Sequence, residues 1–331
     1  TSFMDTILLI FTLLDTEIDF DTRISQIYYA WDKAVSMCRM KGIELSLHYA
    51  KPNVLTSFHG IEVHIFVRCL KLLHCVNIRE SDLPIIFQKI QDVLWSLGID
   101  LEELTACHVD FCHNFIVVDK KERMQYMKLF AKSHWTFYKA VRKDPEEIEN
   151  YNNLYWSCID KHNKKHTQVF NLQLYDKTEE RNNKGIKPEE YEEHVLRLEF
   201  QVRERLVQKK AAKGFPNGVF DWINWDVRAK ALASTQKLFY SVDFYTLRKA
   251  YTILKHSGLP LSRCDEIRQF MSDISQVDVD FAFSRTTKYR AEKYISQLSA
   301  LGINPIPIPQ NAGMPFLKNP LRAFYEGGGV A

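Results

Sequence analysis

Apolar and polar residues alternate along several short stretches of this chain, which is the pattern of strands that bury one face. The apolar run between Asp5 and Asp15 predicts a buried first strand. Alternation returns at residues 60–70, 104–118 and 194–203. In the last of these, the apolar positions Leu196, Leu198, Phe200 and Val202 oppose Arg197, Glu199, Gln201 and Arg203. These stretches predict a sheet with one apolar face.

Helical spacing of apolar residues marks the segments between these strands. Residues 22–40 place an apolar stripe on one side of a helix, made of Ile24, Ile27, Trp31, Val35 and Cys38. A second amphipathic helix is predicted from a cap at Ser81 to Gly98, and a longer helix over 119–142. Two more strands are predicted on either side of a basic turn at 160–166, which reads DKHNKKH.

The order of these elements predicts the fold class. Strands alternate with helices up to residue 142 and then follow one another, which favours an α+β domain with a largely antiparallel sheet and helices packed on one side. From about residue 227 the pattern is helical. We therefore predict a first domain over 4–226 and a helical C-terminal domain over 227–331, of the winged-helix DNA-binding kind.

Composition narrows the class of protein. The chain has 331 residues, of which 46% are hydrophobic, so it can bury one large core or two ordinary ones. Its seven cysteines lack the spacing of a disulfide framework, which favours a reduced compartment, and we predict a cytoplasmic protein without a membrane partner. A net charge of +3 does not by itself predict nucleic-acid binding.

Two basic clusters nevertheless stand out. The first contains Arg203, Arg205, Lys209, Lys210 and Lys213, and the second contains Arg285, Lys288, Arg290 and Lys293. Either cluster is equally well explained as the solvated face of a helix.

Residues 170–181, FNLQLYDKTEER, predict a strand that runs into a charged turn. Its alternation places Phe170, Leu172 and Leu174 on a core face, and Asn171, Gln173, Tyr175 and Lys177 on a polar, solvent-facing side. A tyrosine hydroxyl has a pKa near ~10 and needs a neighbouring cation, base or metal to act as a nucleophile. We interpret Tyr175 as a residue that attacks a phosphate, with Lys177 stabilising the phenolate or the transition state.

Other strands carry acids and imidazoles opposite their apolar residues. In the 104–118 strand, Ala106, His108, Asp110 and Cys112 share one face. A candidate set of site residues on the sheet is His64, His108, Asp110, Arg197 and Glu199. Carboxylates with one or two imidazoles suit Mg²⁺ or Mn²⁺ better than structural zinc. Such an ion would polarise a phosphodiester, with Lys177, Arg197 or Arg203 neutralising charge.

Several alternatives stay open. Tyr175 could be an aromatic residue at a sheet edge, and Asp110 and Glu199 could pair with arginines. A zinc site in CHVDFCH is disfavoured because alternation sends Cys107 and His113 to the face opposite His108 and Cys112. Tyr151 and Tyr155 are spaced like a helical tyrosine pair, but their context favours packing residues at a strand edge.

An ordered set of motifs resembles the rolling-circle replication initiators of the filamentous-phage gene II and gene X type, which are distantly related to plasmid replication initiation factors. The motifs are MDTILLIF, IEVHIFVRCLKLL, HVDF where the family usually reads Arg-Ile-Asp, LQLYDKTEE, LRLEFQVR and YISQLSALGI, between residues 4 and 305. The resemblance implies a nuclease fold of the replication-initiator and relaxase kind, with 4–226 as the nicking domain.

The resemblance also implies an activity. Such an enzyme is a metal-dependent endonuclease and strand transferase that nicks one DNA strand at an origin, stays linked to the 5′ end through tyrosine and leaves a 3′ hydroxyl. Tyr175 matches the nucleophile, Lys177 its basic neighbour, and Asp110 and Glu199 the metal-binding acids. His64 falls where a glutamate is usual, so either His64 or Glu62 is the ligand, and His108 would add another.

The partners implied are single-stranded or hairpin origin DNA, a host helicase and polymerase, and a second copy in a homodimer. DNA contacts are expected from Arg197, Arg203, Arg205, Lys209, Lys210, Lys288 and Arg290. Two rival functions remain: a conjugative relaxase with the same chemistry, and a non-catalytic DNA-binding protein that reads sequence with a helix in 284–298.

Overall fold

A computed structural model describes residues 6–14, 17–38, 42–50, 60–133, 139–140, 153–159, 168–202 and 239–322 of the chain. The chain divides into two compact units. Unit 1 is Thr1–Asn114, Ile159–Leu172 and Leu198–Arg228, and unit 2 is Phe115–Cys158, Gln173–Arg197 and Ala229–Ala331. The predicted boundary at 226–227 lies outside the described residues, so it stays a prediction.

The elements up to residue 202 are β1 (Thr6–Leu14), α1 (Phe20–Cys38), β2 (Ile43–Ala50), β3 (Gly60–Arg68), α2 (Cys69–Leu73), η1 (Glu80–Asp82), α3 (Leu83–Ser96), η2 (Leu101–Glu103), β4 (Thr105–Ile116), α4 (Lys120–Ala131), β5 (Lys139–Ala140), β6 (Asn153–Ile159), β7 (Gln168–Asp176), α5 (Lys177–Asn183), η4 (Glu190–Glu192) and β8 (Val195–Val202). After these come β9 (Phe244–Tyr245), α9 (Leu247–Lys255), α10 (Leu261–Gln276), α11 (Val279–Ser284), α12 (Lys288–Ala300), η5 (Gln310–Ala312) and β10 (Phe316–Leu317).

Within the described ranges, the main sheet has eight strands in the order β2-β3-β1-β4-β8-β7-β6-β5. The pairs β1 with β3, β1 with β4, β2 with β3, and β5 with β6 are all antiparallel. Together with the helices, this confirms the predicted α+β class with an antiparallel sheet. Among the described residues, no helix has both the length and the apolar character needed to cross a bilayer.

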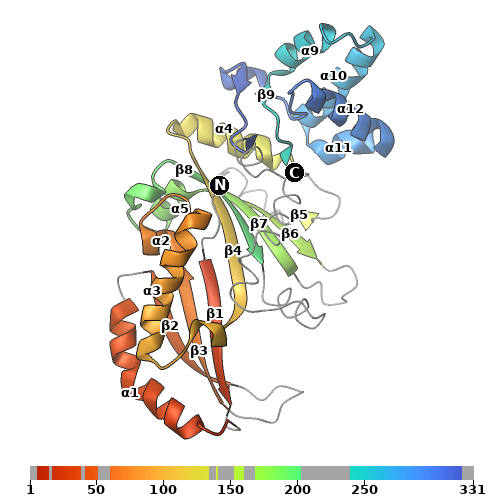
Figure 1. Ribbon diagram of the computed structural model, residues 1–331. Helices are drawn as coiled ribbons and strands as arrows, with labels where there is room; N and C mark the ends of the chain where they lie inside the picture. Colours follow the sequence, from red (N-terminus) through yellow and green to blue (C-terminus); the bar gives the residue numbers. More distant parts are fainter. Residues whose placement is uncertain are drawn as a thin grey trace. The chain divides into compact units, whose positions relative to one another are not determined.

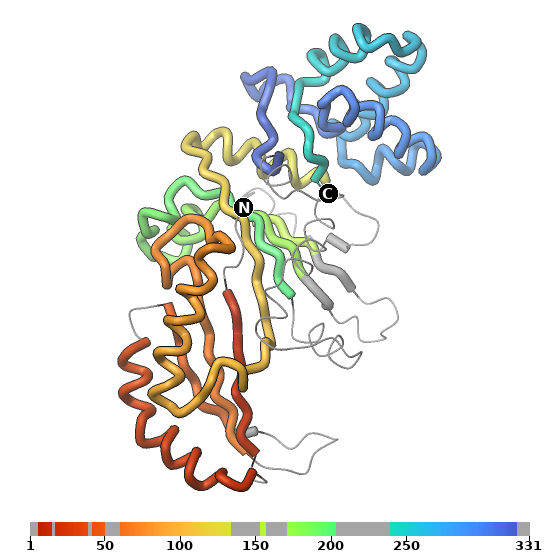
Figure 2. Tube along the Cα trace, in the orientation of Figure 1, coloured from red at the N-terminus to blue at the C-terminus, as the bar shows by residue number. Residues whose placement is uncertain are grey.

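In unit 1, helices α1, α2 and α3 lie against one side of strands β1, β2 and β3 (Figure 1, Figure 2). The alternation of the sequence explains why: Ile7, Leu9 and Leu13 of β1 are fully buried. They share that face with the buried Val63 and the other apolar residues of β3. Burying each such side chain contributes about 1.5–3 kcal/mol, which fixes the register because a one-residue slip would expose them all.

Strand β4 departs from simple alternation. Leu8 of β1 pairs with His108, but the next residue, Leu9, pairs with Ala106, so β4 carries a bulge at this point. Because paired residues share a face, Ala106 joins the core face with Leu9 while His108 lies on the second face with Leu8. The prediction that Ala106 and His108 share a face is therefore wrong.

Four other elements differ from the prediction. Strand β2 was not predicted, although Ile43–Ala50 does alternate. Helix α4 begins after Asp119, whose carboxylate accepts hydrogen bonds from the N–H groups of Lys121 and Glu122, and it ends at Ala131 rather than at 142. Residues Lys139–Ala140, inside the predicted helix, form β5. Helix α5 was also missed, because its sequence, KTEERNN, has no apolar stripe.

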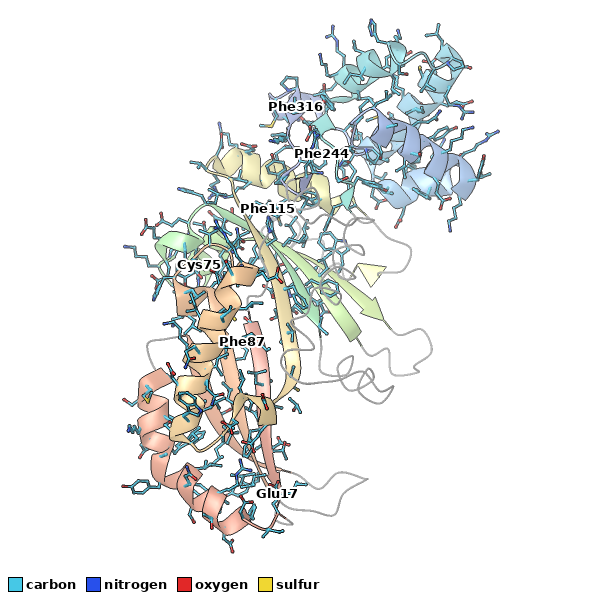
Figure 3. The ribbon with its side chains drawn as sticks, in the orientation of Figure 1. Glu17, Cys75, Phe87, Phe115, Phe244 and Phe316 are labelled. Atoms are coloured by element: carbon cyan, nitrogen blue, oxygen red, sulfur yellow. The ribbon has the colours of Figure 1, made fainter. Side chains whose placement is uncertain are left out.

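Unit 2 has an aromatic core that joins α4 and β6 to the C-terminal segment. The ring of Phe130 meets Phe239 edge-on at 5.0 Å and Phe244 at 5.6 Å between centroids, and Trp156 meets Phe239 at 5.2 Å. Figure 3 labels Phe244, which is fully buried. Such aromatic pairs add about 0.5–1.5 kcal/mol each beyond the area they bury.

Helices α9 to α12 occupy the predicted helical region. Thr246 and Thr287 cap α9 and α12 by accepting hydrogen bonds from the N–H groups of Lys249 and Arg290. Beside these helices, β9 and β10 pair as a small antiparallel sheet. The identity of this region as a separate DNA-binding domain stays a prediction.

Candidate functional site

Tyr175 lies near the end of β7 and is only 7% exposed. The prediction of a solvent-facing Tyr175 is therefore wrong. Lys177 is not part of the strand but the first residue of α5. The chain changes from strand to helix at Asp176, whose carboxylate caps α5 by accepting a hydrogen bond from the Glu179 N–H at 3.2 Å.

Two cations approach the Tyr175 ring within unit 2. The Lys177 Nζ is 5.7 Å from the ring centroid, and the Arg197 guanidinium carbon is 5.9 Å from it. Arg197 comes from β8, the neighbour of β7 in the sheet, and both cations are buried. The three residues that the sequence assigned to nucleophile and charge neutralisation are thus neighbours, and each cation lies at the distance of a cation–π contact.

Acidic residues balance the positive charge around this tyrosine. The Lys177 Nζ is 2.8 Å from a Glu180 oxygen. Arg181 donates two hydrogen bonds to the carboxylate of buried Glu192, at 2.8 and 2.5 Å. Burial lowers the pKa of Lys177, and the nearby Arg197 charge lowers it further, against the opposing effect of Glu180. Lys177 is therefore more easily deprotonated than an ordinary lysine.

Buried Arg123 of α4 holds the end of β7. Its Nε donates to Asp176 at 2.6 Å, and its Nη1 donates to the carbonyl oxygens of Val117 and Val118 at 2.6 and 3.0 Å. Asp176 thus caps α5 and binds Arg123 at once. Nothing in the sequence singles out Arg123, which looks like one more charged residue of a helix. We call Arg123, Tyr175, Asp176, Lys177, Arg181, Glu192 and Arg197 the β7–α5 cluster.

In unit 1, the predicted metal ligands occur in pairs. The His108 Nε2 lies 2.7 Å from an Asp110 oxygen, and the two side chains are largely buried. Both residues pair with β1, His108 with Leu8 and Asp110 with Thr6. These two predicted ligands therefore contact each other.

A second pair, on β3, is more exposed. The His64 Nε2 lies 2.9 Å from a Glu62 oxygen, so the two alternative ligands contact each other. The ring of His48, on the unpredicted strand β2, lies 4.2 Å from that of His64, and the His48 Nε2 is 2.9 Å from the Ser46 hydroxyl. His48 was missed with its strand.

The His108–Asp110 pair and the His64–Glu62 pair lie at different positions along β1. His64 pairs with Ile10 of β1, while His108 pairs with Leu8, and β1 lies between their strands. Glu199, on β8, is buried and accepts a hydrogen bond from Gln201 at 2.5 Å. Within the described part of the chain, no three His, Cys, Asp or Glu side chains gather closely enough to enclose a metal ion. These residues alone do not complete the predicted Mg²⁺ or Mn²⁺ site.

The remaining candidates are scattered or lie elsewhere. Tyr191 is in η4, and burial, followed by the charges of Glu192 and Glu189, raises its pKa to about 12, which makes it a poorer nucleophile. Tyr155 lies in β6, while Tyr151 lies outside the described residues. Lys288 and Arg290 are exposed on α12. The basic residues Arg203, Arg205, Lys209 and Lys210 also fall outside the described residues.

No protein-family model matches the chain, and a search of curated proteins also found no match.

Proposed function

We propose that this protein is a DNA nicking and closing enzyme of the rolling-circle initiator kind, with Tyr175 as its nucleophile. The observation that supports this most is the β7–α5 cluster, in which the Tyr175 ring has the Lys177 ammonium at 5.7 Å and the Arg197 guanidinium at 5.9 Å. Two buried cations beside this ring can stabilise the extra negative charge of a phosphate under attack.

In the proposed step, the Tyr175 Oη attacks the phosphorus of a phosphodiester. The Oη–P bond forms and the P–O3′ bond breaks, while the phenol loses one proton and the departing 3′ oxygen gains one. The product keeps one phosphodiester linkage, so the reverse reaction rejoins a strand without a nucleotide cofactor. Because Tyr175 is 7% exposed, DNA binding has to uncover it before attack.

A divalent cation remains part of the proposal as a predicted cofactor, with Asp110, His108 and Glu199 as candidate ligands and either His64 or Glu62 beside them. We assign no step to it, since these residues do not complete a site. Calorimetric titration of Mn²⁺ into the full chain, Asp110→Ala and Glu199→Ala tests the ligands without relying on activity. Unchanged affinity in both variants removes them from the ligand set.

The test of the proposed function is formation of a covalent protein–DNA adduct. The full chain is incubated with Mn²⁺ and a pool of labelled single-stranded oligonucleotides, and denaturing gels show whether the label stays on the protein. We expect an adduct with the wild-type chain and none with Tyr175→Phe, which removes one oxygen and keeps the ring beside its cations.

Matched controls are Tyr155→Phe and Tyr191→Phe, which should keep the adduct. If Tyr175→Phe still forms the adduct and Tyr191→Phe does not, the nucleophile is Tyr191 and the proposal is wrong about the site. If the wild-type chain binds the oligonucleotides but forms no adduct across the pool, the protein binds DNA without nicking it.

A further inference from the structure

Among the residues that the structure describes, helix α12 is anchored along one side. Its buried residues Ala291, Tyr294 and Leu298 recur at helical spacing and face the rest of the C-terminal region. The Tyr294 ring lies 5.5 Å from that of Phe270 on α10, and its hydroxyl donates to Glu266 at 3.0 Å. These contacts fix the rotation of α12, and so fix which side chains point outward.

The outward side of α12 is basic. Tyr289 is 73% exposed, the Lys288 side chain is 76% exposed, and Arg290 and Lys293 are exposed as well. The helix carries these three cations against a single acid, Glu292, whose carboxylate is 3.8 Å from the Lys288 Nζ. We call the surface formed by these residues the α12 face: Lys288, Tyr289, Arg290 and Lys293.

The helix before α12 completes a recognisable arrangement. Helix α11 ends at Ser284 and α12 begins at Lys288, so three residues connect them. Phe270 of α10 contacts both helices, with its ring 6.0 Å from Phe283 of α11 and 5.5 Å from Tyr294 of α12. Two helices joined by a short turn and supported by a third form the architecture of helix-turn-helix DNA-binding modules.

We infer that α12 binds duplex DNA by entering the major groove, with the cations of the α12 face on the flanking phosphates. An α-helix with side chains is ~10–12 Å wide and the major groove of B-DNA is ~12 Å wide, whereas the major groove of duplex RNA is too narrow for a helix. Because this needs neither Tyr175 nor a nick, the duplex-binding surface goes beyond the proposed function.

The test measures binding of the full chain to a fluorescent mixed-sequence DNA duplex of ~20 base pairs, about two helical turns. Lys288→Glu combined with Lys293→Glu should raise Kd on the order of tenfold, and should lower the slope of log K against log salt by about 2, since each phosphate contact contributes ~0.9. Glutamate is favourable in the first turn of a helix, so the Lys288 change should not unfold α12.

The matched control is Arg248→Glu combined with Lys249→Glu on α9, which makes the same change in net charge at two exposed positions. We expect its Kd to change less than twofold, because the inference assigns no phosphate contact to α9. Equal losses in the two double variants would mean that only overall charge matters, and would overturn the inference. Circular dichroism of both variants checks that the helices are intact.

Two further arms separate the alternatives. A duplex RNA of the same sequence should bind at least tenfold more weakly than the DNA duplex, and equal binding would overturn the groove geometry. Tyr175→Phe should bind duplex DNA as the wild type does. A wild-type chain that binds duplex DNA but forms no adduct would contradict the proposed nicking and leave this inference intact.

Discussion

Lys177 and Lys288 occupy equivalent positions in opposite surroundings. Each is the first residue of a helix, after the capping residues Asp176 and Thr287. Each has a glutamate one turn later, Glu180 at 2.8 Å for Lys177 and Glu292 at 3.8 Å for Lys288. The Lys177 side chain is 10% exposed, and that of Lys288 is 76% exposed.

This difference in burial predicts a difference in use. A buried ammonium loses solvation, which lowers its pKa, and its position is fixed by packing, so it can act on one bond at one place. An exposed ammonium keeps its charge and its freedom, and it acts by displacing counterions from a polyanion, an effect that falls as salt rises. We therefore connect the β7–α5 cluster with chemistry and the α12 face with binding.

The largest effect should come from removing a buried charge that positions the cluster. Arg123→Met leaves Asp176 buried without its partner and two carbonyl oxygens without their donor. Loss of one member of a buried ion pair costs about 3–5 kcal/mol, so we expect the free energy of unfolding in urea to fall by that amount.

Arg68→Met provides the exposed counterpart. Arg68 is 2.9 Å from Glu44, but both side chains are about half exposed. The free energy of unfolding should therefore fall by about 1 kcal/mol or less. Similar losses for the two variants would mean that burial does not separate these charges as we describe. If Arg123→Met were stable but formed adduct slowly, Arg123 would matter chiefly as a positioning residue.

Next in size is the effect of Lys177 on adduct formation. Lys177→Met keeps most of the aliphatic stem and removes the ammonium near the Tyr175 ring. Removing one group that stabilises transition-state charge costs on the order of 10²–10³ in rate, and we expect that loss in single-turnover adduct assays. Lys184→Met is the control, because Lys184 is exposed and also pairs with Glu180. A comparable loss in the control would assign the effect to Glu180 instead.

Much of the fold could be predicted because alternation of apolar residues records burial. Ile7, Leu9 and Leu13, like the apolar residues of β3, are buried on the face that the sequence indicated. The bulge in β4 is not visible in the sequence pattern, because it depends on how β4 pairs with β1. The face of the sheet on which Ala106 lies was therefore predicted wrongly. Helix α5 is short and polar, and its only local signal is the cap at Asp176.

Only the part of the candidate site that is formed by residues close together in the sequence could be predicted. Tyr175 and Lys177 are neighbours in sequence, but Arg197 meets them because β8 lies beside β7, and Arg123 meets Asp176 across 53 positions of the chain. His48 was not predicted as a site residue because β2 was not predicted as a strand, although Glu44, Ser46 and His48 alternate with apolar residues there. Solvent exposure of Tyr175 was inferred from period-two alternation, which indicates opposite faces but not whether the second face is covered.

The smallest effect concerns the carboxylates, and it has a distinct pH dependence. Burial raises the pKa of Glu192, but the hydrogen bonds from Arg181 and the Glu189 backbone outweigh it, so the pKa in the folded chain lies below its ordinary value of 4.5. A lowered carboxylate pKa contributes stability that is fully present above 4.5 and is lost as the pH falls through the folded-state pKa.

Glu192→Gln should therefore lose about 1.5–3 kcal/mol at neutral pH, the range for hydrogen bonds to charged groups, and the difference from wild type should shrink in acid. Glu292→Gln, on exposed α12, should change stability by about 0.5 kcal/mol or less at any pH. Urea unfolding from neutral pH down to pH 4 or below measures both. A constant difference for Glu192→Gln would show that shape rather than charge holds Arg181, and the contrast between buried and exposed carboxylates would then fail.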